Sequence, residues 1–113
     1  MNKISKSSLV FWGGLLLSAV SLASHADEEF KLSIKNHQFT PAEITIPAGK
    51  KVKLIISNLD ATPEEFESYD FHREKIIPGN STAVVFVGPL RAGTYKFFGE
   101  FNPKTAQGKL IVK

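Results

Sequence analysis

The feature that most constrains the fold is a short alternation of apolar and polar residues that recurs along the chain. The clearest apolar members form two runs: Phe30, Leu32 and Ile34, then Val52, Leu54 and Ile56. Successive side chains of a β-strand point to opposite faces of its sheet, so a period of two predicts a strand with one buried face. The chain is therefore expected to be built from short, half-buried strands.

Turn residues separate the alternating runs. Pro47-Ala48-Gly49 and Pro78-Gly79-Asn80 are typical turn sequences, and a weaker alternating set runs near residues 65–77. No helical period is present after residue 26, and the only expected helical turn lies at residues 61–65, where Pro63 follows Thr62. The pattern predicts an all-β fold: one antiparallel Greek-key β-sandwich of about seven or eight strands.

The chain contains no cysteine, and its only methionine is Met1. A disulfide framework is therefore excluded, and apolar packing must hold the domain together. Thiolate and thioether metal ligands are excluded as well. Any metal ion would have to be held by carboxylates, imidazoles, amides, backbone groups or water.

Residues 1–26 are built like an export signal. Lys3 and Lys6 provide a basic start, an apolar run covers residues 9–20, and Ser24-His25-Ala26 forms a cleavage site with small residues. The run is shorter than the roughly 20 residues of a membrane span, although an uncleaved anchor is the alternative. We expect cleavage after Ala26, a domain over residues 27–113, periplasmic localisation and no membrane span after cleavage.

Charge gives little information about partners. Without Lys3 and Lys6 the chain keeps 12 basic residues against 11 acidic ones, a net charge of +1. The densest basic cluster is Lys50, Lys51 and Lys53. These lysines alternate with Val52 and Leu54, as the solvent-facing residues of a strand would. A nucleic-acid interface would need a broader basic surface with stacking aromatic residues, so no nucleic-acid partner is expected.

Two long segments carry a family resemblance. NHQFTPAEITIPAGKKVKLIISNLD, at residues 36–60, resembles the first half of a cupredoxin, and GPLRAGTYKFFGEFNPKTAQGKLIV, at residues 88–112, resembles the second half. With TPEEFES and REKIIPG, the chain is similar to the small periplasmic cupredoxin-like proteins that accompany iron permeases and to the N-terminal domain of EfeO from ferrous-iron uptake systems. This resemblance implies an inner-membrane iron permease, or its periplasmic components, as the partner.

The resemblance also implies where a copper site would lie. A blue-copper cupredoxin has a Cys at the end of its penultimate strand, a His three residues later and a Met five residues further on, which fall on Gly99, Asn102 and Gln107 here. The earlier His of such a site falls at Glu64 or Glu65, and the sequence leaves open which. No blue-copper centre is therefore expected.

Acidic residues are concentrated near the same end of the expected fold. If Phe66 is buried, Glu65 and Glu67 share the opposite face of a strand, about 7 Å apart along it. The candidate metal ligands, for a copper or iron ion, are Glu65, Glu67, His72, Glu100 and Asn102. Carboxylates with one imidazole suit Fe(III), Fe(II) or Mn(II), and can also hold Cu(II).

The resemblance supports only part of this set. The resemblance implies that the iron-uptake domain binds metal through a Glu in the matching segment and through two Cys. The positions of those two Cys fall near Phe39 and Gly99 in this chain. A purely structural interpretation also stands, in which the acidic segment is a solvated strand and loop with Arg73 and Lys75 pairing off the charge. His37 is a further, weaker ligand candidate, since no second partner for its imidazole can be named.

Three functional hypotheses follow. The first is a periplasmic metal-binding accessory protein of a metal or iron uptake system, which uses an oxygen-rich site in place of the blue-copper site. The second is a metal-free cupredoxin scaffold that docks onto a permease or partner protein. The third is an accessory ferrous-iron oxidase, but the sequence displays no redox centre for it. Hydrolase, phosphate-loop and cysteine-nucleophile motifs are all absent, so whether the chain is an enzyme stays undecided, with a non-enzyme favoured.

Overall fold

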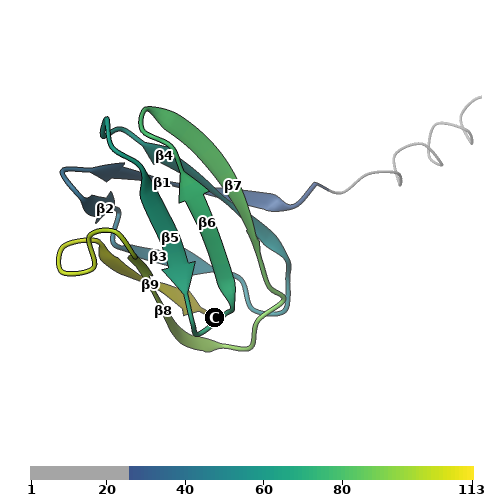
Figure 1. The fold of residues 1–113 in the computed structure, drawn as a ribbon. Helices are drawn as coiled ribbons and strands as arrows, with labels where there is room; N and C mark the ends of the chain where they lie inside the picture. The colour runs from purple at the N-terminus through teal and green to yellow at the C-terminus, as the bar shows by residue number, and fades with distance from the viewer. Residues whose placement is uncertain (1–25) are drawn as a thin grey trace, which may run out of the picture.

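A computed structural model of the protein describes residues 26–113, which form two sheets packed face to face (Figure 1). The four-stranded sheet has the order β2-β1-β4-β7, and the five-stranded sheet has the order β3-β9-β8-β5-β6. The strands are β1 (Glu28–Lys35), β2 (Gln38–Thr40), β3 (Glu43–Ile46), β4 (Val52–Asn58), β5 (Glu64–Ser68), β6 (Arg73–Ile77), β7 (Ser81–Val87), β8 (Gly93–Gly99) and β9 (Gln107–Val112). The predicted all-β sandwich is confirmed.

The described part of the chain has nine strands, where the sequence predicted about seven or eight. The weak alternating set near residues 65–77 is in fact two strands, β5 and β6, which form an antiparallel hairpin. His72 lies in the connecting turn with a φ of 54°, a left-handed conformation that lets the chain reverse within four residues. This hairpin brings together residues on which the candidate site depends.

Both sheets are mixed and not purely antiparallel. β1 pairs with β4 in parallel, with Phe30 opposite Leu54, and β3 pairs with β9 in parallel, with Ile44 opposite Leu110. The other pairings are antiparallel. Alternation along a strand shows which face is buried but carries no information on the direction of the neighbouring strand, so the sequence alone could not reveal the two parallel pairs.

The core lies between the two sheets. Val52, Leu54 and Ile56 of β4 are fully buried, as their alternation predicted. Phe39, Phe66 and Phe97 form a cluster in which every ring contacts the other two, with centroids 5.0 Å apart for the two pairs with Phe97 and 6.0 Å apart for Phe39 and Phe66. Burying each such side chain stabilises the fold by about 1.5–3 kcal/mol, and the aromatic contacts hold β5 and β8 to β2 of the opposite sheet.

The expected helical turn at residues 61–65 is wrong, and no residue that the structure describes is helical. The proline at position 63 disfavours the α conformation in Thr62. The Thr62 carbonyl instead accepts a hydrogen bond from the Asn58 side chain at 2.9 Å. β5 then begins directly at Glu64, whose side chain turns into the sandwich.

The predicted export signal occupies residues 1–26, and all but its last residue lie outside the described part of the chain. Its cleavage after Ala26 and the resulting localisation therefore remain predictions. Within the described part, the structure contains no helix that is long and apolar enough to cross a membrane.

Asp60 ties together two turns at one end of the sandwich. Its carboxylate accepts hydrogen bonds from the backbone N–H groups of Asn36 at 2.8 Å and His37 at 3.0 Å. Both of these residues are left-handed, with φ values of 53° and 57°, so the carboxylate stabilises a turn that would otherwise be strained. The His37 N–H and then the Asn36 N–H hold the pKa of Asp60 below its ordinary value of 3.8.

Replacing Asp60→Asn is expected to lower the free energy of unfolding at pH 7 by about 1–2 kcal/mol, because an amide cannot accept both hydrogen bonds on equivalent oxygens. A lowered pKa in the folded state means that the contribution is fully present above the unfolded pKa, and is lost as the pH falls through the folded pKa. Urea unfolding between pH 2 and pH 7 measures this difference.

Glu43→Gln is the matched control, since the Glu43 carboxylate makes only an exposed ion pair with Lys109 at 3.4 Å. A difference between wild type and Asp60→Asn that persisted unchanged to pH 2 would contradict the role of the Asp60 charge.

Candidate metal centre

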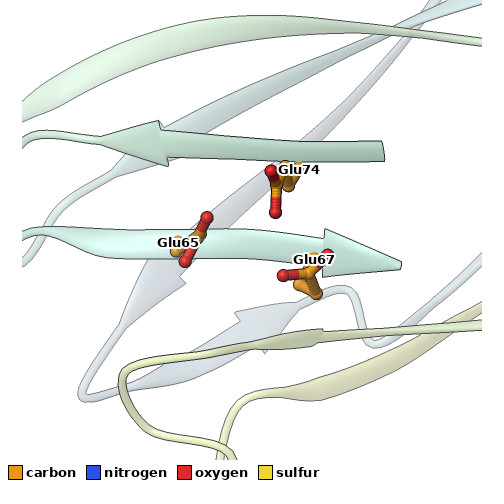
Figure 2. Close-up of side chains that lie close together, drawn as sticks. All are labelled: Glu65, Glu67 and Glu74. Carbon is orange, nitrogen blue, oxygen red and sulfur yellow. The ribbon is translucent and has the colours of Figure 1, made fainter. Parts of the chain in front are cut away.

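Three carboxylates gather on the outer face of the five-stranded sheet (Figure 2). Glu65 and Glu67 project from β5, and Glu74 projects from β6 directly opposite Glu67. One oxygen of each lies within 4.8 Å of the others. Phe66 between them is fully buried, so the predicted sharing of one outer face by Glu65 and Glu67 is confirmed. We call Glu65, Glu67 and Glu74 the outer cluster.

No ion pair among the described residues includes a member of the outer cluster. The expected pairing with Arg73 and Lys75 is wrong for this structure. The Arg73 guanidinium instead donates to the backbone carbonyls of Phe86 at 2.8 Å and His72 at 2.9 Å, which binds it to β7. The three acidic groups therefore face one another without a basic partner.

The electrostatics of the outer cluster are those of crowded anions. Partial burial raises the pKa of Glu67, and the neighbouring carboxylates of Glu74, Glu65 and Glu100 raise it further. Burial and the same kind of repulsion, chiefly from Glu74, also raise the pKa of Glu65. A cation in this position would relieve the repulsion, and protons and metal ions would compete for it.

Two other predicted ligands border the outer cluster without joining it. The backbone N–H of Glu100 donates to the carbonyl of Glu65 at 2.8 Å, so Glu100 lies beside β5. His72 lies in the exposed β5–β6 turn and lines a shallow depression together with Glu67 and Glu74. The structure thus brings Glu65 and Glu67 together with Glu74, and leaves Glu100 and His72 at the edge.

The fifth predicted ligand, Asn102, lies on the other side of β5. Its side-chain amide donates at 2.8 Å to the carboxylate of Glu64, which is only 1% exposed. Glu64 therefore points into the sandwich toward Asn102, while Glu65 points out. Of the two alternatives that the sequence left open, Glu64 is the residue that faces the positions implied for a copper site.

Gly99 lies against the same buried carboxylate. A Cβ atom at position 99 would be 2.6 Å from Cδ of Glu64 and 2.7 Å from Cβ of Ala106. Both distances are far shorter than van der Waals contact. A residue with a side chain therefore cannot replace Gly99 unless Glu64 and Ala106 shift.

Comparison with known proteins identifies the family. The family described as a cupredoxin-like domain matches residues 8–112. The chain belongs to this family. The uncharacterized protein RP394 of Rickettsia prowazekii (strain Madrid E) is 46% identical over 84 residues, which cover 74% of this chain and 67% of that protein.

Solved structures share the cupredoxin-like fold. Auracyanin A, a blue copper protein from the green thermophilic photosynthetic bacterium Chloroflexus aurantiacus, matches with a TM-score of 0.67 and 18% identity, over 78% of this chain and all of that one. The Cu(I)-bound metal-binding domain of the Cu(I)-exporting P-type ATPase CopA from Streptococcus pneumoniae D39 matches with a TM-score of 0.65 and 16% identity, over 80% of this chain and 92% of that one. At these identities the likeness shows the fold alone.

Glu74 is the residue that the sequence-based ligand set missed in this cupredoxin-like domain. It belongs to the acidic segment, but only the hairpin register places it opposite Glu67. A turn placed at residues 69–72 would have revealed this pairing, since residues 68 and 73 then face each other and so do 67 and 74. The signal was present in the sequence, but it depended on recognising that one weak alternating set was two strands.

Replacing Glu67→Gln is expected to stabilise the metal-free protein at pH 7 and low ionic strength by about 0.2–1 kcal/mol, because like charges directly opposite on paired strands repel. A pKa raised in the folded state means that the wild type regains this stability as the pH falls through the folded pKa. Thermal unfolding with chelator, at pH 7 and pH 4, measures the gain.

The gain should shrink at 1 M salt and at pH 4, whereas Glu28→Gln, an exposed carboxylate on β1, should show no such gain. Destabilisation by Glu67→Gln under all of these conditions would mean that the carboxylate has a favourable contact instead of a repulsive one.

Proposed function

We propose that this cupredoxin-like domain binds a copper or iron ion on the outer face of its five-stranded sheet, through the outer cluster. The observation that carries the proposal is the convergence of three carboxylates within 4.8 Å, without a basic partner among the described residues. Like charges this close raise each other's pKa and repel, and a cation between the three carboxylates would remove that repulsion.

The donor set favours hard or borderline cations. Carboxylate oxygens suit Fe(III), Fe(II) and Mn(II) and can also hold Cu(II), and the absence of cysteine from the sequence rules out a thiolate site. His72, which lines a depression with Glu67 and Glu74, and Glu100, whose backbone N–H donates to Glu65, are the candidates for further ligands. The raised pKa values of Glu65 and Glu67 imply that a bound ion displaces protons, so binding should weaken as the pH falls.

Within this proposal the domain is an exported accessory protein of a metal-uptake system. It would deliver its ion to an inner-membrane iron permease or to the periplasmic components of that permease. The support for this role is the resemblance of the sequence segments to permease-associated cupredoxin-like proteins and the predicted export signal at residues 1–26.

The first test is calorimetric titration of the purified protein with Cu(II), and with Fe(III) supplied as a soluble chelate. Wild type should bind about one equivalent of at least one of them. The triple variant Glu65→Gln, Glu67→Gln, Glu74→Gln should bind more than roughly tenfold more weakly, because it lacks all three anionic ligands. Lowering the pH from 7 to 5 should weaken binding by the wild type.

The matched control is the triple variant Glu28→Gln, Glu29→Gln, Glu43→Gln, which removes the same charge from β1 and β3. It should bind like the wild type. Equal loss in both variants would mean that binding follows net charge, and no saturable binding by the folded wild type would refute the proposal.

A second candidate function is docking onto a partner protein, and one observation favours it. Tyr69 is 68% exposed and packs edge-on against Phe98, with ring centroids 5.3 Å apart, on the same face as the outer cluster. Exposed aromatic residues beside charges are common in protein interfaces. Tyr69→Ala should weaken partner binding while it leaves the metal titration unchanged, so the two functions can be separated.

A further inference from the structure

The buried carboxyl group of Glu64 lies beneath the β8–β9 loop, on the side of β5 opposite to the outer cluster. It has no basic partner among the described residues, yet neutral donors surround it. Its Oε1 atom accepts from the backbone N–H of Glu65 at 3.0 Å and of Phe101 at 2.8 Å, and its Oε2 atom accepts from the Asn102 amide at 2.8 Å. Burying a carboxyl group without hydrogen-bond partners costs free energy. The three donors offset that cost and hold the group in one orientation.

Two of the three donors, the Phe101 backbone N–H and the Asn102 amide, come from the loop between β8 and β9. This loop is already compact through its own backbone: the N–H of Ala106 donates to Asn102 at 2.9 Å, and the N–H of Gly99 donates to Ala106 at 2.8 Å. Glu64 lies on β5, outside the loop, and its carboxyl group fastens the loop to that strand. It thereby fixes Phe101, which stays 48% exposed at the surface.

We propose that Glu64, Gly99 and Asn102 form a metal-independent lock that fastens the β8–β9 loop to β5 and closes this end of the sandwich. Gly99 provides the space that the carboxyl group occupies, and Asn102 provides a donor whose orientation the carboxyl group sets. The carboxyl oxygens accept three N–H donors, so these contacts hold the end of the sandwich together without a metal ion. The lock goes beyond the proposed function and does not depend on it.

A reciprocal exchange of side chains tests the lock. Asn102→Asp alone puts two carboxyl groups face to face, and should lower the thermal unfolding midpoint by roughly 10 °C. Glu64→Gln alone should have a smaller effect, since a rotated Asn102 amide can still pair with it. The double variant should recover most of the loss, because the glutamine NH₂ can donate to the carboxylate at position 102.

Chelator separates the lock from a hidden metal site. The experiment is run in the background Glu65→Gln, Glu67→Gln, Glu74→Gln, so that the outer cluster cannot contribute, and the midpoint is measured with and without EDTA. The lock predicts no change. A lower midpoint with EDTA would show that an ion holds this end together, and additive effects of the two exchanged residues would show that they are not coupled. Either result would overturn the proposal.

A second measurement covers the case in which Asn102→Asp does not fold. Asn102→Ala removes one donor, and amide hydrogen exchange at Phe101 should become about tenfold faster as the loop loosens from β5. Lys104→Ala, an exposed change in the same loop, is the control and should leave that exchange rate unchanged. Unchanged exchange at Phe101 in Asn102→Ala would also overturn the lock.

Discussion

The interaction on which this domain most depends is the packing of Phe66 against Phe39 and Phe97 in the core. Burying Phe66 fixes which residues of β5 face inward, because side chains alternate along a strand. Glu64 is thereby sent into the sandwich, while Glu65 and Glu67 are sent to the surface. The burial of one aromatic ring therefore places Glu64 in the interior, where it accepts hydrogen bonds, and places Glu65 and Glu67 on the surface, where they join the outer cluster.

The fold could be predicted from the sequence, because the two-residue period of runs such as Phe30, Leu32 and Ile34 shows which face of each strand is buried. The parallel pairing of β1 with β4 could not, since a strand's partner is chosen by packing across the whole sandwich. The helical turn expected at residues 61–65 failed for a related reason. Its local signals were outweighed by the burial of Glu64 and by the hydrogen bond from Asn58 to Thr62.

The candidate site was predictable in part. The shared face of Glu65 and Glu67 follows from the period of β5 alone, and this was predicted correctly. The convergence with Glu74 requires the register of the β5–β6 hairpin, which a left-handed residue, His72, helps to set. The position of Asn102 requires the loop after β8 to fold back onto Glu64, a contact between residues 38 apart in the chain. The local alternation of β5 was therefore enough to predict the face that carries Glu65 and Glu67. The positions of Glu74 and Asn102 depend on contacts between residues that are distant in the sequence.

The contact between Gly99 and Glu64 restricts how this sequence could change. Any side chain introduced at position 99 meets the Glu64 carboxyl group and Ala106 at once, so such a change would be selected against while Glu64 is present. A larger residue at position 99 therefore requires a smaller residue at position 64 together with a shift of the segment that carries Ala106. Mutational routes between this sequence and relatives with a side chain at position 99 are therefore expected to include changes both at position 64 and around Ala106.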